Sequence, residues 1–339
     1  MNLRQEVIEP EGIDRSSCIF TSDACQHAAS LPDWSQEYLQ LSPGRFSGEI
    51  VEASTGPIQV FRETLNQCVD EKAHPRPDTY TIGVPIEVEP GGLWQGRALV
   101  PDSLMTLNPN EELHFRTPRQ SSILVAVVGR AAFERHALAA VGVDVQPLIA
   151  QSRAEQLRPD LAQQYRATLN NVLACATTTP EVLEYSASSK AMTEAVLNAA
   201  LLALRARPST SEQLRGGHHV QRSIVERARN HVLANPESPP TVSELSAHLK
   251  MSRRGLHHAF INVLGINAAT FLRYVRLHGV RKELLRAGND QSVSVVAYKW
   301  GFWHMGMFSS YYKTLFGETP SATLRHPPGI ISTQQVRLH

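Results

Sequence analysis

Basic side chains gather near residue 255 with a spacing that suits contact with DNA bases. On a helix that buries Leu256 and Phe260, they would share the opposite, solvent-facing side. An arginine can donate two hydrogen bonds to O6 and N7 of guanine, and a histidine can donate to the same acceptors. The alternative is a solvated basic face; we favour base contact for the last three residues of the group and phosphate contact for Arg253. The group consists of Arg253, Arg254, His257 and His258.

Residues 304–313 would form a second helix whose solvent-facing side chains are shorter than those near residue 255. No Lys or Arg precedes Lys313 there, so we expect it to read bases weakly. Trp300 and Trp303 are predicted to pack in the core rather than to wedge between bases. Cations around both stretches would fix the register on phosphates, which carry no sequence information. The outward positions are His304, Met305, Gly306, Ser309 and Ser310, and the phosphate candidates are Arg273, Arg276, Lys299 and Lys313.

Both stretches belong to a two-helix pattern that occurs twice, 51 residues apart. Each copy ends at a glycine, Gly265 or Gly317, which can adopt a left-handed C-cap without a steric penalty. Two short helices joined by a tight turn form a helix-turn-helix motif, and two motifs on one chain could enter two grooves of DNA. The matched apolar positions are Val242, Leu245, Leu249, Leu256 and Phe260 in the first copy, and Val293, Val296, Trp300, Phe308 and Tyr312 in the second.

Capping residues and a connecting segment support this pattern. Thr241 is followed three residues later by Glu244, which predicts a capping box, and Ser252 is placed to cap the next helix. Between the copies, residues 268–285 contain no Pro and predict a continuous helix of about 27 Å. Since successive major grooves lie about 34 Å apart, both second helices could enter adjacent grooves. We expect an earlier helix from Ser223, as its N-cap, to Leu233.

The second motif and its tail contain a specific set of residues. The set consists of Gly301-Phe302, Phe308, Tyr312-Lys313, Phe316-Gly317 and Pro320-Ser321. With them, residues 220–326 resemble the DNA-binding domain of the AraC/XylS transcription regulators. Within that family the chain is most similar to regulators of ethanolamine-utilisation operons, on residues that include Trp303-His304, Ser252–Arg254, Pro43-Gly44 and residues 58–63. This similarity implies an effector-sensing cupin-like jelly roll, with ethanolamine and adenosylcobalamin as the effectors.

Charge divides the 339-residue chain into two parts. Residues 220–326 hold 14 Lys and Arg against 6 Asp and Glu, so their formal charge is +8, whereas the remainder has 19 against 26 and is −7. A basic block beside an acidic one is typical of a nucleic-acid binder with a separate sensing domain, although two unrelated domains could differ in the same way. We expect a sensing and dimerisation domain over 1–206, a linker over 207–219, a DNA-binding domain over 220–326 and a tail over 327–339.

Cysteine spacing and hydropathy limit the location of the protein. The four cysteines form no Cys-x-x-Cys pair, so reduced thiols are expected. The N-terminal sequence MNLRQEVIEPEG lacks the apolar segment of a secretion signal. The longest apolar runs are shorter than the roughly 20 residues of a membrane helix. The expected location is the cytoplasm, without a membrane partner.

Short apolar runs separated by Gly and Pro occupy residues 46–128 and predict six or seven strands in a sandwich or small barrel. The fold class is therefore α+β: an N-terminal cupin-like β-barrel with following helices, and an all-α C-terminal domain with two helix-turn-helix motifs. Asp33 is expected to cap a short helix over 34–41, after a loose arm over 1–33 that could add an edge strand. Arg62, Glu63, Tyr80 and Trp94 are candidate ligand-binding residues, with core or surface roles as the alternative.

His74 and His114 are isolated in the sequence, with no His-x-His pair nearby. A metal site needs three or more converging ligands, so we expect no metal, no cofactor and no enzyme activity. A small-molecule enzyme of the cupin class is the most distant alternative.

Long helical segments over 159–176 and 181–204 follow the strands. The second has an apolar face that includes Met192, Val196 and Ala203, which predicts either a homodimer contact or packing on the barrel. The function that we expect is a sequence-specific DNA-binding regulator, an effector-responsive activator of a catabolic operon. Its partners would be double-stranded DNA, a small-molecule effector and a second copy, with RNA polymerase as a further candidate. In the alternative, the barrel only dimerises or binds a protein.

Overall fold

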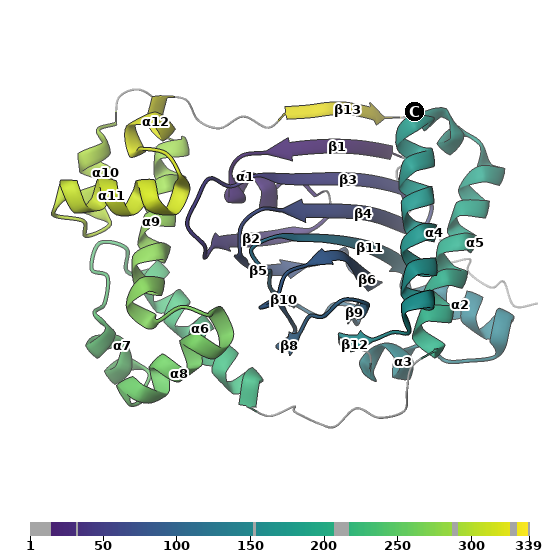
Figure 1. Ribbon diagram of the computed structural model, residues 1–339, viewed down its shortest axis with the longest axis horizontal. Helices are drawn as coiled ribbons and strands as arrows, with labels where there is room; N and C mark the ends of the chain where they lie inside the picture. The colour runs from purple at the N-terminus through teal and green to yellow at the C-terminus, as the bar shows by residue number, and fades with distance from the viewer. Residues whose placement is uncertain are drawn as a thin grey trace, which may run out of the picture.

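The computed structural model describes residues 15–31, 33–151, 154–206, 217–286, 291–325 and 331–337. Two antiparallel sheets occupy the centre of the molecule (Figure 1), with a pair of long helices at one end and the helices of the C-terminal third at the other. The mixed architecture agrees with the expected strand-rich N-terminal part and helical C-terminal part. Among these residues no helix is both long and apolar enough to cross a membrane.

The larger sheet has the strand order β12-β9-β6-β11-β4-β3-β1-β13. Alternating apolar residues of β4 and β11 are buried on both faces, because the sheet has a helical layer on one side and a second sheet on the other. Its strands are β1 (Arg15–Thr21), β3 (Gly48–Thr55), β4 (Ile58–Leu65), β6 (Thr79–Val88), β9 (Ser103–Leu107), β11 (Ser121–Gly129), β12 (Glu155–Gln156) and β13 (Ile331–Arg337).

The smaller sheet has the order β2-β5-β10-β7-β8. Trp94 and Phe115 of this sheet pack against Phe61 and Val125 of the larger one. The two sheets face each other without forming one closed ladder in the described part of the chain, so the predicted cupin-like barrel is not closed, and the sheets form a sandwich. Two-residue strands at one edge leave too few backbone groups for closure. The strands are β2 (Ser35–Gln40), β5 (Val69–His74), β10 (Leu113–Arg116), β7 (Leu93–Trp94) and β8 (Arg97–Ala98).

Strand β2 replaces the helix that we expected over 34–41. Asp33 has φ +64°, a left-handed conformation, and does not cap a helix. Tyr38 is buried between the sheets, whereas Leu39 and Leu41 are buried among the C-terminal helices. Side chains that alternate between two cores require the period of a strand, and this tertiary requirement is not visible in the local sequence. The described part of the predicted arm is also structured, as β1 and the short helix α1 (Ala24–Ala28).

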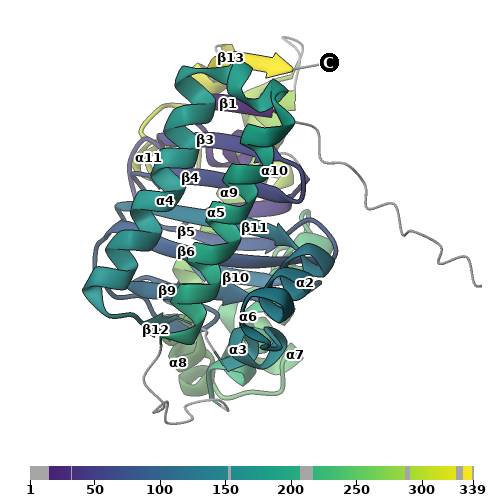
Figure 2. The same ribbon diagram turned by 90° about the vertical axis from the view of Figure 1, so that its right-hand side faces the viewer.

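Helices α4 (Pro159–Thr178) and α5 (Ser186–Arg205) lie across the larger sheet (Figure 2). Val196, Leu197 and Leu201 of α5 are buried in the same core as Val60 and Leu124 of the sheet. The apolar face that predicted a homodimer contact is therefore used within the chain, since Val196 and Ala203 are 0% and 2% exposed. Shorter helices complete this layer: α2 (Arg130–Val141), α3 (Gln146–Gln151) and the 3-10 helix η1 (Pro180–Glu184).

The C-terminal helices reproduce the duplicated motif. Gly265 and Gly317 both adopt φ +72° at the C-caps, as predicted. The connecting helix is continuous, also as predicted. Ser223 does not cap the first helix, which begins six residues earlier at Gly217. The helices are α6 (Gly217–Ala234), α7 (Val242–His248), α8 (Arg253–Leu264), α9 (Ala268–Arg286), α10 (Val293–Lys299), α11 (Met305–Phe316) and α12 (Pro320–Arg325).

The structure describes only parts of the predicted linker and of the predicted tail. The predicted linker, 207–219, falls mostly on residues 207–216, which lie outside the described residues. The predicted tail, 327–339, is partly described: β13 pairs with β1 in the antiparallel direction and forms an edge of the larger sheet. The backbone after the helical region therefore returns to the N-terminal sheets.

Candidate nucleic-acid interface

Helix α8 presents the four basic residues that the sequence singled out. Ser252 caps it by accepting a hydrogen bond from Gly255 N at 3.1 Å, and Leu256 and Phe260 are fully buried. Since these anchors fix the rotation of the helix, Arg254, His257 and His258 are held on the exposed side. Arg253 is also exposed and donates to Ser243 Oγ at 2.7 Å.

Helix α7 begins with a capping box and is joined to α8 by a tight turn. Thr241 Oγ1 accepts from Glu244 N at 3.2 Å while Glu244 Oε2 accepts from Thr241 N at 2.8 Å, so the predicted capping box is confirmed. The turn between the helices passes through Lys250 at φ +54°. Gly301, 51 residues later, has φ +72° at the same place in the second motif. The two turns therefore share one backbone conformation despite different residue types.

Helix α11 differs from α8 in what it offers to a ligand. Its N-cap is His304, whose Nδ1 accepts from Met307 N at 3.2 Å. Of the other outward positions, Gly306 and Ser310 are exposed, and Met305 and Ser309 are half-buried. Trp303 is 82% exposed directly before the helix, so its predicted place in the core is wrong. Phe302, the residue before it, occupies the core of the second motif instead.

Trp300 is buried, as predicted, because α9 leaves room for it at a glycine. A Cβ added to Gly279 would lie 2.2 Å from Trp300 Cη2, so no other residue type fits there without displacement. The indole Nε1 donates to Glu283 Oε1 at 2.9 Å. These contacts fix α10 against α9 and thereby set the position of the second motif relative to the first.

The four cations proposed for phosphates have different surroundings. Arg276 donates to Trp300 O at 2.8 Å and to Gly301 O at 2.7 Å, so it stabilises the second turn. Arg273 lies over the ring of Tyr311 at 4.4 Å. Lys299 pairs with Glu283 at 3.0 Å and remains 45% exposed. Lys313 is exposed on α11.

The four candidate ligand residues do not come together in one place. Glu63 is buried between the sheets, whereas Arg62, its neighbour on β4, points the other way and pairs with Glu49 at 3.3 Å. Tyr80 donates to Glu134 Oε1 at 2.8 Å on the helical side of the larger sheet. Trp94 donates to Thr106 O at 3.2 Å in the core between the sheets. The period of two along a strand explains the separation of Arg62 from Glu63.

Glu63 instead belongs to a buried polar cluster that the sequence analysis missed. Tyr38 Oη donates to Glu63 Oε1 at 2.6 Å, and His27 Nε2 lies 3.0 Å from the same oxygen. Glu71 is 2% exposed, and burial, followed by the charge of Glu63, raises its pKa well above the ordinary value. Gln36 Nε2 donates to Glu71 Oε1 at 3.2 Å. The sequence placed Glu63 in a predicted strand but gave no signal that its side chain would be buried beside Glu71.

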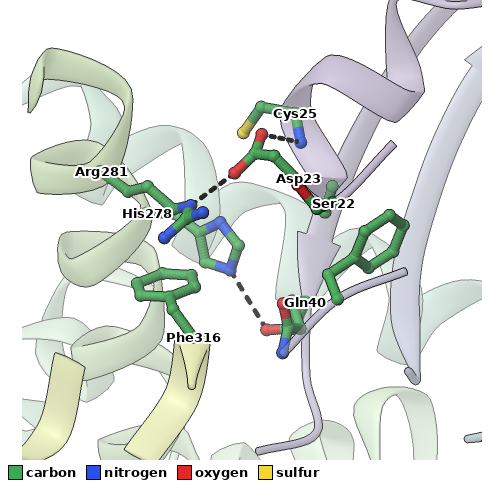
Figure 3. A pocket seen from close by; sticks show the side chains of 9 residues that line it. Ser22, Asp23, Cys25, Gln40, His278, Arg281 and Phe316 are labelled. Atoms are coloured by element: carbon green, nitrogen blue, oxygen red, sulfur yellow. Dashed lines mark hydrogen bonds and ion pairs between the residues drawn. The ribbon is translucent and has the colours of Figure 1, made fainter. Parts of the chain in front are cut away.

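The outer face of the smaller sheet, together with α1, packs on the C-terminal helices; we call this contact the seam. Arg281 of α9 forms an ion pair with Asp23, which caps α1 (Figure 3). His278 Nε2 lies 3.2 Å from Gln40 O, and burial lowers the pKa of His278 to about 4. These groups line a small pocket together with Cys25 and Phe316.

Further contacts extend the seam toward α6. Arg222 of α6 pairs with Asp70 of β5 at 2.6 Å, with side chains 8% and 1% exposed. Gln40 Nε2 donates to Leu315 O at 2.8 Å. Leu39 and Leu41 complete the core of the first motif. The seam is thus both apolar and charged, and it holds both motifs against the N-terminal part.

The chain is similar in sequence to known regulatory proteins. Residues 245–326 match the family model of a helix-turn-helix domain. A probable thc operon regulatory protein from Rhodococcus erythropolis is 26% identical over 290 residues, which cover 84% of this chain and 86% of that protein. A XylDLEGF operon transcriptional activator from Pseudomonas putida is 31% identical over 117 residues, 32% of this chain and 36% of that protein. The solved structure of a probable AraC family transcriptional regulator from Rhodopseudomonas palustris CGA009 is 31% identical, covers 30% of this chain and 95% of its own, and has a TM-score of 0.29.

These relatives are regulators of operons, and their names give no support to the more specific similarity to ethanolamine regulators. The matched segment contains α8 and α11, whose exposed faces were predicted to contact DNA. The chain is a DNA-binding transcriptional regulator, and its C-terminal third is similar to that of regulators of the AraC/XylS family.

Proposed function

We propose that this regulator responds to a small-molecule effector bound by its N-terminal part and activates a catabolic operon. The observation that carries the proposal is helix α1, which contacts the buried polar cluster at one end and the seam at the other. His27 in α1 lies 3.0 Å from Glu63 Oε1, and Asp23 at its N-cap pairs with Arg281 of α9. A ligand that engages Glu63 would act on the C-terminal helices through a single turn of helix.

The surroundings of His27 make this coupling stiff. The side chain is fully buried, and its Nδ1 lies 2.8 Å from Thr21 Oγ1. A Cβ added to Gly48 would lie 2.5 Å from the imidazole, so the ring is in close contact with the backbone of β3. Close-packed interiors transmit displacement because they contain little free volume. A shift of Glu63 would therefore move α1 rather than be absorbed locally.

The charge of the cluster favours a cationic effector. Glu63 and Glu71 are 5% and 2% exposed, and two carboxyl groups in one poorly hydrated site repel each other when both are ionised. A protonated amine would relieve this repulsion. Ethanolamine has that charge, and it is the effector that the sequence resemblance implies. We therefore keep it as the first compound to test, with adenosylcobalamin as the second.

The proposal includes a homodimer and contact with RNA polymerase when the regulator is bound at a promoter. Because the apolar face of α5 is buried on the sheet, a dimer would use other residues. In the alternative, the N-terminal part only dimerises or binds a protein partner. That alternative predicts no small-molecule binding, and a DNA affinity that depends on protein concentration or on the added partner.

Calorimetry of the full chain with ethanolamine, adenosylcobalamin and both together tests the proposal. We expect binding that Glu63→Gln abolishes and that Arg62→Gln preserves, because Arg62 points away from the cluster on the same strand. Measured in parallel, the affinity for promoter DNA should change when the effector is added. No heat and no change in melting temperature with either compound would end the ethanolamine assignment and leave DNA binding intact.

A further inference from the structure

We propose that the seam contains a binding site for one divalent transition-metal ion of the zinc class. Its ligands come from both parts of the chain: Glu112 and His114 from the N-terminal part, and Glu226 from α6. His114 Nε2 lies 3.2 Å from Glu112 Oε2 and 3.2 Å from Glu226 Oε1. His74 Nε2 lies 3.3 Å from Glu112 Oε1. The two histidines that are isolated in the sequence thus reach one carboxylate.

Strand pairing explains how these residues meet. In the antiparallel register of β5 and β10, Leu113 faces Ala73 and His114 faces Lys72. Continuing this register by one residue places His74 opposite Glu112. Both histidines lie on the outer face of the smaller sheet, where α6 covers it. Arg222, one turn before Glu226, pairs with Asp70 of β5, and this buried pair fixes the position of α6 over the site.

The spacing of the donor atoms suits a tetrahedral ion. One ligand atom from each of Glu112, His114 and Glu226 can be chosen so that all three lie within 4.8 Å of one another. With metal–ligand bonds of about 2.0–2.1 Å, the ligands of a tetrahedral zinc ion are separated by about 3.3–3.4 Å. The observed separations of 3.2 Å are close to that value. One imidazole with two carboxylates, and a fourth position open to water, suits zinc, cobalt or nickel better than magnesium or calcium, which prefer oxygen ligands alone.

Hydrogen bonds explain the arrangement around His114 less well than a bound metal ion does. An imidazole Nε2 carries at most one hydrogen, so it cannot make a full hydrogen bond to both carboxylates. Nδ1 of the same ring is buried and has no hydrogen-bond partner among the described residues. The cations beside the site, Lys72 at 2.9 Å from Glu112 Oε1 and Arg222 at 3.2 Å from Glu226 Oε1, pair with the carboxylates and leave Nε2 unassigned. An ion at this point would bind Nε2 and both carboxylates at once.

Solvent can reach the site, because the side chains of His114, Glu112 and Glu226 are 23%, 27% and 28% exposed. A metal ion bound there would join strand β10 to the first helix of the DNA-binding part. It would therefore stabilise the seam independently of the effector and of DNA, since an ion that binds only the closed arrangement favours it by mass action.

The test uses the full, untagged chain after treatment with a chelator, without DNA or effector, titrated with Zn²⁺ by calorimetry and with Co²⁺ by absorption. We expect one equivalent of either ion, with visible absorption of tetrahedral Co²⁺ and no thiolate charge-transfer band. His114→Gln and Glu226→Gln should each weaken binding by more than about tenfold, because the loss of a group that only supports a ligand already weakens metal binding by about 10–100-fold. His136→Gln is the matched control, since His136 lies on α2 and contacts Asn198 of α5.

Melting curves with excess chelator show whether each variant is folded; if one is not, Glu112→Gln replaces it. Zn²⁺ should raise the melting temperature of the wild type and of His136→Gln but not that of the ligand variants. The proposal is overturned if no stoichiometric binding occurs, if the ligand variants bind like the wild type, or if thiolate bands assign the ion to cysteines. Because neither effector nor DNA is present, these outcomes are separate from those that test effector sensing.

Discussion

Arg281 of α9 and Asp23 at the N-cap of α1 form a buried ion pair although 258 residues separate them in the chain. Their side chains are 4% and 1% exposed. Arg281 also donates to Glu318 Oε1 at 2.8 Å and lies 4.6 Å from the ring centroid of Phe316. One guanidinium therefore connects the N-terminal sheets to the end of the second helix-turn-helix motif, and a change at α1 reaches the DNA-binding part directly.

Replacing Asp23 by Asn should destabilise the protein. An Asn side chain keeps the oxygen that caps α1 but removes one of the two carboxylates that Arg281 contacts. Because Arg281 keeps Glu318 but loses its more deeply buried partner, we expect the free energy of unfolding to fall by about 1.5–3 kcal/mol in urea denaturation at neutral pH. The control is Asp33→Asn, which removes a half-exposed partner of Arg15 and should cost less than about 1 kcal/mol. Equal, small losses in both variants would mean that the pair does not stabilise the seam.

The stability of the seam should decrease in mild acid because of His278. Burial lowers its pKa to about 4 in the folded protein, whereas an unfolded chain has a value of about 6.5. The unfolded state therefore binds more protons between these values, so the stabilisation is complete above pH 6.5 and is lost as the pH falls toward 4. From pH 7 to pH 5 the free energy of unfolding should fall by about 2 kcal/mol more in the wild type than in His278→Gln.

His278→Gln is informative because Gln can still donate to Gln40 O but does not titrate. His136→Gln, at an exposed site, should keep the pH dependence of the wild type. Parallel curves for the wild type and His278→Gln between pH 7 and 5 would show that His278 is not the group responsible.

Gly279→Ala should weaken the second motif. The added Cβ would overlap the Trp300 ring, so either the indole or α9 must move, and overpacking of this kind costs about 1–3 kcal/mol. Gly255→Ala in α8 is the matched control: its Cβ would lie 3.3 Å from Ser252 Oγ and 3.5 Å from Met251 Cε, and Ala is the better helix former by up to about 1 kcal/mol. Thermal denaturation with DNA binding as a second readout distinguishes the two. A variant at Gly279 that melts and binds DNA like the wild type would contradict the close contact.

Local signals predicted the duplicated motif well. The capping box at Thr241, the cap at Ser252 and the C-cap glycines depend on residues within one turn of helix, so the sequence contains the whole interaction. The strand pattern of residues 46–128 was equally readable, because Gly and Pro mark its turns. The order of the strands and the open edges of both sheets depend on pairing between distant segments and were not predictable in this way.

The errors share a physical cause. Residues 35–40 form a strand because Tyr38 and Leu39 enter different cores, and the second of these cores belongs to helices more than 180 residues later. Trp303 was assigned to the core by its apolarity, although Phe302 already fills that place. The pairs Arg222–Asp70 and Arg281–Asp23 join residues 152 and 258 positions apart, so no local pattern could have indicated the seam.

We expect the two motifs to read DNA unequally. Helix α8 exposes Arg254, His257 and His258, whereas α11 exposes Gly306 and Ser310 and uses His304 to cap its own backbone. A bidentate base contact contributes about 1–3 kcal/mol of discrimination, while a phosphate contact contributes almost none. The half-site under α8 should therefore be strictly specified. The half-site under α11 should tolerate base changes and depend on phosphates and DNA shape.

Selection of bound sites from a random library, for the wild type and two variants, measures this difference. Arg254→Ala should relax the preference at one or two base pairs of the strict half-site. Lys313→Ala should weaken binding to all sequences alike and reduce the salt dependence by about one counterion. Two equally sharp half-sites in the wild type, or an unchanged preference in Arg254→Ala, would contradict unequal reading. In that case Trp303→Ala tests whether this side chain reads the second half-site. Its indole is 82% exposed at the start of α11 and is long enough to reach the bases. Its removal should relax the base preference of that half-site alone.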